Sequence, residues 1–161
     1  MLLTLLWIDV AGGMRNREII MLESNPKTIL VVGGSKENQL GNCLQEVFRH
    51  PLFRYFNWSM RQFQTCRQVL AFLRQNPIPL IISWSEMPDG NWRDLLRQLM
   101  LLTNPPLLAV SYQPTGRYFW SEVISLGGYN VLAKPFHVPD VFRMVSLAWE
   151  NWKDRNRSAR A

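Results

Sequence analysis

The apolar residues of this chain gather into short runs that alternate with longer stretches of helical periodicity. Five short runs are typical of strands, at residues 29–32, 54–58, 79–84, 107–111 and 129–133. The stretches that follow carry apolar residues at helical spacing, at residues 36–49, 62–75, 92–102, 118–126 and 139–152. Strict alternation of this kind predicts a three-layer α/β/α sandwich around a five-stranded parallel sheet. Pro51 is expected only to end the first helix, before a second strand at 54–58.

The loop that follows the third run, residues 79–84, bears most on the function. Ligands of open α/β sheets bind outside the carboxyl ends of the strands. Here the strand ends at Trp84, which stands between Ser83 and Ser85, and Asp89-Gly90 then predicts a turn. An indole flanked by two hydroxyls is poorly suited to a charged or metal-assisted reaction.

The two ends of the chain differ from the alternating region. Residues 1–27 form an N-terminal extension whose first eight residues are mostly apolar. That run is too short to span a bilayer, which takes about 20 residues, and it lacks the leading basic residue of a signal peptide. Residues 154–161 are expected to form a basic C-terminal tail. The folded domain should therefore cover residues 28–153, with no membrane span.

Charge and cysteine usage narrow the class of protein. The net charge of +6 is scattered along the chain, and we find no recognition helix, zinc spacing or aromatic–basic RNA motif, so a nucleic-acid partner is not favoured. Cys43 and Cys66 lie in helical patterns without CxxC spacing. This usage predicts reduced, buried thiols in a cytoplasmic protein.

Four motifs stand at the ends of the predicted strands. They are Met87-Pro88 with the nearby Asp89-Gly90, Ser111, Gly127-Gly128, and Lys134-Pro135-Phe136. In this order and at these positions, they make residues 28–152 resemble the receiver domain of bacterial two-component response regulators (the CheY-like superfamily). The resemblance implies the flavodoxin-like strand order 2-1-3-4-5. It also implies that Ser111, Lys134 and Pro135 are retained family residues.

The departures from the family pattern concern its chemistry. The resemblance would place a phosphoacceptor aspartate four residues before Pro88, where this chain has Trp84, and two acidic metal ligands at Gly33 and Gly34. Magnesium needs carboxylate oxygens, and phosphoryl transfer to aspartate needs that ion. We therefore expect no metal, no cofactor and no catalysis. An atypical phosphoacceptor at Ser83 or Ser85, in a two-component phosphorelay, stays open as the alternative.

Lys134 would lose its usual carboxylate partners in such a site. Because a desolvated, unpaired ammonium group is costly, we expect it to reach solvent, a backbone carbonyl or the indole face of Trp84. This residue and Ser111 are more simply explained as structural than as active groups.

A surplus of aromatic residues predicts a protein contact. Three adjacent aromatic residues on one helix cannot all face the core, and the last helix is apolar over a wide arc. The candidates are Tyr118, Phe119, Trp120, Trp149 and Trp152. They would lie on the fourth-helix, fifth-strand, fifth-helix face, for homodimerisation or for an unknown regulator or kinase, although dense local packing would also explain them.

The sequence therefore predicts a stand-alone pseudo-receiver. It would be a non-catalytic, cytoplasmic signalling module that acts by phosphorylation-independent protein–protein interaction.

Overall fold

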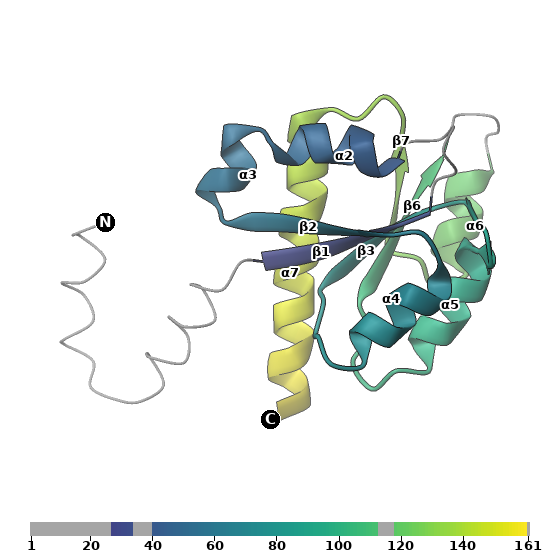
Figure 1. The fold of residues 1–161 in the computed structure, drawn as a ribbon. Helices are drawn as coiled ribbons and strands as arrows, with labels where there is room; N and C mark the ends of the chain where they lie inside the picture. The colour runs from purple at the N-terminus through teal and green to yellow at the C-terminus, as the bar shows by residue number, and fades with distance from the viewer. Residues whose placement is uncertain (1–26, 34–39, 113–117, 161) are drawn as a thin grey trace, which may run out of the picture.

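A five-stranded parallel sheet forms the centre of the molecule, in a computed structural model that describes residues 27–33, 40–112 and 118–160. The strand order is β2-β1-β3-β6-β7, which confirms the predicted flavodoxin-like topology (Figure 1). The strands are β1 (Lys27–Val32), β2 (Trp58–Phe63), β3 (Leu80–Trp84), β6 (Leu107–Tyr112) and β7 (Asn130–Ala133). A small antiparallel hairpin of β4 (Glu86–Met87) and β5 (Gly90–Asn91) follows β3.

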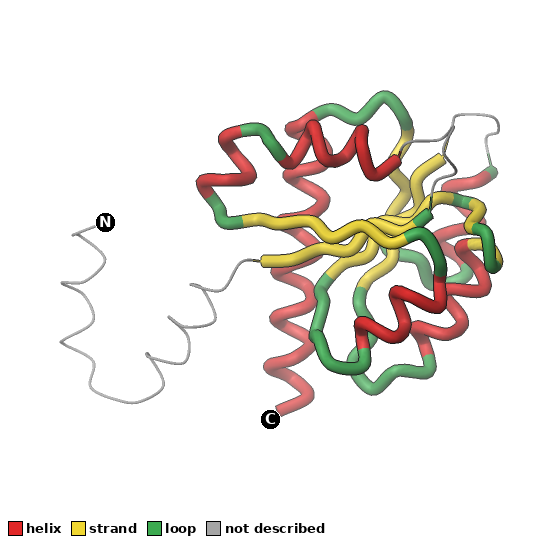
Figure 2. The backbone as a smooth tube through the Cα atoms, in the orientation of Figure 1, coloured by secondary structure: helices red, strands yellow, loops and turns green. Residues whose placement is uncertain are grey.

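Helices cover both faces of the sheet, as the alternating pattern predicted (Figures 1 and 2). One face carries α2 (Leu40–Phe48), α3 (Pro51–Tyr55) and α7 (Val138–Arg160). The other carries α4 (Cys66–Leu73), α5 (Trp92–Met100) and α6 (Phe119–Ser125). None of the helices in the described part of the chain is both long and apolar enough to cross a membrane.

The strands are apolar on both sides because both of their faces are covered. Successive side chains of a strand point to opposite faces, so Ile29 and Val31 pack in the core beneath α2 and α7. Leu30 and Val32 pack in the second core, beneath α4, α5 and α6. Every residue of β3 is buried, as expected for the central strand of a parallel sheet.

The second strand begins four residues later than the sequence predicted. Pro51 starts a further helix, α3, because proline fits the first turn of a helix. The Nδ1 atom of His50 accepts a hydrogen bond from the backbone N–H of Leu52 at 3.2 Å and so caps this helix. Asn57, with φ of 59°, then turns the chain into β2, and Trp58 pairs with Lys27. The prediction of a strand at 54–58 was wrong for this reason.

Two helix boundaries also differ from those expected. Helix α4 starts at Cys66 rather than at residue 62, and a reciprocal capping box of Thr65 and Gln68 fixes that start. Helix α7 continues to Arg160, so that residues 154–160 are helical rather than a tail. The i, i+3 pair Arg157–Asp154, 3.9 Å apart, lies within this extension. The N-terminal extension, apart from Lys27, lies outside the described residues, as do positions 36–39 of the first expected helix.

Candidate functional site

The predicted site residues meet at the carboxyl edge of the sheet. Trp84 ends β3 and pairs in register with Ser111 of β6. Ser111 in turn pairs with Leu132 of β7, two residues before Lys134. Gly33 follows the end of β1, whereas Gly34 lies outside the described residues. The topology thus brings Gly33, Trp84, Ser111 and Lys134 to one edge, as expected from the strand ends.

An indole and an ammonium group occupy the centre of this edge. Trp84 is only 7% exposed and belongs to the core beneath α2 and α7. The Nζ atom of Lys134 lies 4.7 Å from the centroid of the Trp84 ring and 5.9 Å from that of Phe136. A cation over an indole face is the strongest form of this contact. We expected the Lys134 ammonium group to reach solvent, a backbone carbonyl or the indole face of Trp84, and in the structure it lies over the indole face. The Lys134–Pro135 peptide bond is cis.

Gly33 lies so close to its neighbours that it leaves no room for a side chain. Its φ of 93° falls in the left-handed region that favours glycine. A Cβ atom added there would lie 2.8 Å from Cγ of Met87, 3.1 Å from Cβ of Trp84 and 3.3 Å from the carbonyl oxygen of Glu86. A carboxylate-bearing residue could not occupy this position without displacing the hairpin. The sequence showed that position 33 lacks an acidic residue, but it did not show that Met87 packs against this position.

The three serines of the edge differ in their accessibility. Ser83 and Ser111 are both 0% exposed, and neither hydroxyl has a hydrogen-bond partner among the described residues. Ser83 pairs with Val110, which belongs to the core beneath α4, α5 and α6. A phosphoryl donor cannot reach a hydroxyl enclosed in this way. Ser85 is half-buried, and its carbonyl oxygen accepts a hydrogen bond from the backbone of Trp92 at 3.2 Å.

The chemistry of this edge does not suit a divalent cation. Within the described ranges, no three His, Cys, Asp or Glu side chains come together in a way that could hold a metal ion. In the described part of this edge, the groups around Trp84 are an indole, a thioether, two enclosed hydroxyls and an ammonium group, and the single carboxylate of the adjoining β4, that of Glu86, is exposed. Magnesium prefers several oxygen ligands including carboxylates.

Asp89 in the hairpin has a role that the sequence analysis missed. Its carboxylate accepts hydrogen bonds from the backbone N–H groups of Cys66 at 2.9 Å and Arg67 at 3.0 Å, at the start of α4. Desolvation of the carboxylate by itself raises the pKa of Asp89, but hydrogen bonds from backbone N–H groups outweigh it and bring the pKa below its ordinary value. Because 23 residues separate Asp89 from Cys66, no local pattern could have revealed this contact.

The two cysteines occupy different environments. Cys66 is buried, and its thiol donates to the Met87 sulfur at 3.5 Å. Burial first, and then the nearby Asp89 charge, raise the pKa of Cys66 to about 12. Cys43 is exposed, so the prediction that both thiols are buried was wrong for Cys43. Cys43 lies on the exposed side of α2, whereas the next residue, Leu44, is buried against the sheet.

The aromatic residues predicted to form one interface do not lie together. Tyr118 immediately precedes α6 and Trp120 is its second residue, and they are 82% and 55% exposed. Phe119, between them, packs against Trp92 and Tyr112.

The other two candidates lie on α7, across the sheet from α6. Trp149 packs against Trp58 of β2 with ring centroids 6.1 Å apart, and it stacks on Trp152 at 5.6 Å. This contact turns Trp149 toward β2, at the opposite edge of the sheet from β7. The five residues therefore belong to two separate surfaces, and only Tyr118 and Trp120 are prominently exposed.

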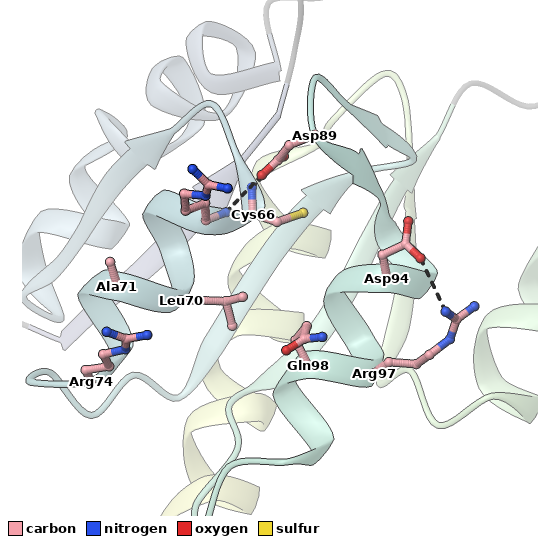
Figure 3. A pocket seen from close by; sticks show the side chains of 9 residues that line it. Cys66, Leu70, Ala71, Arg74, Asp89, Asp94, Arg97 and Gln98 are labelled. Atoms are coloured by element: carbon pink, nitrogen blue, oxygen red, sulfur yellow. Dashed lines mark hydrogen bonds and ion pairs between the residues drawn. The ribbon is translucent and has the colours of Figure 1, made fainter.

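A groove of about 730 Å³ lies between α4 and α5 (Figure 3). Figure 3 shows Leu70 of α4 and Gln98 of α5 pointing toward each other across it. Its lining residues are Cys66, Arg67, Leu70, Ala71, Arg74, Asp89, Asp94, Arg97 and Gln98. This groove could not be predicted from the sequence, because neither helix pattern shows which of its faces meets the other helix.

Comparison with known proteins establishes the fold. No protein-family profile matches the chain, and no curated protein matches it. Among solved structures, the signal receiver domain of an HD domain-containing protein from Pseudomonas fluorescens Pf-5 is 17% identical, with a TM-score of 0.64 over 93% of this chain and 98% of that one. A response regulator receiver domain protein from Clostridium thermocellum is 18% identical, with a TM-score of 0.63 over 78% and 96%.

A third solved structure, of an adenylate cyclase from Rhodopirellula baltica, is 14% identical, with a TM-score of 0.68 over 84% of this chain and 96% of that one. Identities this low show a shared fold and no more. The architecture of this chain is that of response regulator receiver domains.

Proposed function

We propose that this protein is a response-regulator-like signalling module that acts through protein–protein interaction and does not depend on phosphorylation. One observation carries the proposal, namely that the buried Trp84 ring stands where the receiver pattern has its phosphoacceptor and holds the Lys134 ammonium group 4.7 Å from its centroid. In this arrangement the cation that would otherwise meet a phosphoryl group already has a partner.

The surroundings of Trp84 support the same conclusion. A loose pocket could regain function by recruiting a nearby carboxylate, but Met87 and Trp84 pack against Gly33 too closely for an added side chain. Aspartyl phosphorylation needs a metal ion that neutralises the developing charge. The described residues of this edge supply neither an aspartate acceptor nor a cluster of metal ligands, so the proposed function is contact with a partner rather than catalysis.

The alternative of an atypical serine phosphoacceptor receives less support. Ser83 is fully buried on the side of the sheet that packs beneath α4, α5 and α6. Ser85 is partly accessible, but among the described residues no cluster of metal-ligating side chains lies at this edge of the sheet.

Intact-mass spectrometry after incubation with acetyl phosphate and Mg²⁺ tests the proposal. We expect no mass gain, and no change in the NMR spectrum on addition of beryllofluoride. The Ser85→Ala variant is the matched control. A mass gain in the original protein that disappears in this variant would establish the serine alternative and overturn our proposal.

A further inference from the structure

The α4 wall of the groove between α4 and α5 has two apolar residues with an arginine on either side, and the α5 wall is polar. Leu70 and Ala71 lie on one stretch of α4, and Arg67 and Arg74 precede and follow them. Residues at i, i+3, i+4 and i+7 share one helix face. This face of α4 therefore presents a cation, an apolar step and a second cation, in that order, along the groove.

The two arginines are separated by about two helical turns. Arg74 keeps helical backbone angles, with φ of −60° and ψ of −28°, so the spacing continues past the last residue of α4. Seven residues at a rise of about 1.5 Å each place their Cα atoms roughly 10 Å apart along the axis. Both side chains are exposed.

The acidic residues of the groove are already engaged by other partners. Asp89 accepts from the backbone at the start of α4. Asp94 accepts from the backbone of Asn91 at 3.1 Å and from Arg97 at 3.4 Å. Across the described ranges, no carboxylate forms an ion pair with Arg67 or Arg74. Two guanidinium groups, the side chains best suited to bidentate recognition of carboxylates, are thus left available.

We propose that this groove binds an acidic amphipathic helix of a partner protein. Carboxylates two turns apart on that helix would pair with Arg67 and Arg74, and apolar residues between them would pack on Leu70 and Ala71. The inference rests on the proposed function, because it specifies the partner of the interaction module by its chemistry. Charge complementarity supports this occupant, since three arginines and two aspartates line the groove and both aspartates already accept hydrogen bonds. Helix-in-groove recognition uses anchors at i, i+3, i+4 and i+7.

A designed peptide tests the inference without knowledge of the natural partner. The probe is a stapled, fluorescently labelled helix of alanine and glutamine with glutamates at peptide positions 6 and 13 and leucines at 9 and 10, a spacing that follows the i, i+7 and i+3, i+4 rule. The control peptide has the same composition, but its second glutamate stands at position 11, which turns it about 140° off the first. Fluorescence anisotropy should show saturable, micromolar binding of the probe and much weaker binding of the control.

Charge-reversal variants locate the binding site. The double variant Arg67→Glu, Arg74→Glu should weaken probe binding by about tenfold or more, because two attractions become repulsions. The double variant Arg54→Glu, Arg143→Glu makes the same change of charge at exposed positions on α3 and α7, across the sheet from the groove. It should retain affinity within about twofold, as expected for distant charges screened by salt.

Four outcomes would overturn the inference: no probe binding, equal binding of both peptides, equal weakening by both double variants, or displacement of the probe by inorganic phosphate at constant ionic strength. The last would indicate a site for small anions. Repeating the titration with beryllofluoride and Mg²⁺ separates the two proposals. A changed affinity would count against phosphorylation independence, whereas absent binding with no spectral response would count against the groove alone.

Discussion

The contact between Lys134 and Trp84 gives the most informative prediction. In the structure this ammonium group lies 4.7 Å from the indole centroid, and it forms no ion pair with any carboxylate that the structure describes. If the indole has replaced the carboxylates as the partner of Lys134, the two residues should be energetically coupled. A double-mutant cycle of Trp84→Leu and Lys134→Met measures that coupling.

The expected magnitude follows from the environment of the pair. Cation–π contacts contribute about 0.5 kcal/mol at exposed sites and about 2 kcal/mol when desolvated. Trp84 is buried and Lys134 is half-buried, so we expect a coupling free energy of about 1 kcal/mol. Trp84→Leu alone should cost more than this, roughly 2–4 kcal/mol, because a smaller side chain leaves a void in the core beneath α2 and α7.

Urea unfolding followed by far-UV circular dichroism is the assay, since tryptophan fluorescence would change with the substitution itself. The matched control is a second cycle of Lys134→Met with Trp92→Leu. Trp92 is a buried tryptophan beneath the other face of the sheet, and this pair should be additive within about 0.5 kcal/mol. A Trp84–Lys134 coupling no larger than that of the control would refute the idea that the indole holds the ammonium group.

Three further predictions concern Gly33, Asp89 and the two cysteines. Gly33→Asp should lower the free energy of unfolding by about 2 kcal/mol or more, because the residue has a positive φ and its Cβ would collide with Met87; an unchanged urea midpoint would contradict this. The pKa of Asp89 is lowered in the folded state, so its contribution to stability is full above the ordinary carboxyl pKa of about 3.9 and is lost as the pH falls through the folded pKa. Asp89→Asn should therefore destabilise the protein near neutral pH and reduce the loss of stability on acidification, and unfolding curves with the same pH dependence as the original protein would argue against it. At pH 8, iodoacetamide should modify the exposed Cys43 and spare the buried Cys66, whose pKa is raised to about 12; rapid modification of both thiols, read by peptide mass mapping, would show that the thiol of Cys66 is not enclosed as its contact with Met87 implies.

The strands were predictable where burial on both faces made the sequence uniformly apolar. Ile29–Val32 and Leu80–Ile82 have no polar residue to compete with that interpretation, and the structure confirms both as strands. The second strand was misplaced because it lies at the edge of the sheet and carries exposed polar residues such as Arg61. Pro51 was also ambiguous, since proline both ends one helix and begins the next.

The residue types of the site were predictable, but its packing was not. Counting along the motifs placed Trp84 and Lys134 at strand ends, and the register through β6, which lies between β3 and β7, brings them to one edge of the sheet. Contacts made across long stretches of sequence gave no local signal. The approach of Met87 to Gly33 depends on the hairpin after β3, and the capping of α4 by Asp89 depends on that same hairpin.

If an indole and a thioether have replaced the carboxylates at the carboxyl edge of this sheet, that edge should not bind a divalent cation. The decisive measurement is a titration with millimolar Mg²⁺, followed by the NMR signals of the Trp84 indole N–H and the Lys134 amide. We predict that neither signal shows a saturable shift. A saturating, stoichiometric shift of both signals, reversed by a chelator, would show that the edge holds a metal ion and would overturn the proposed function.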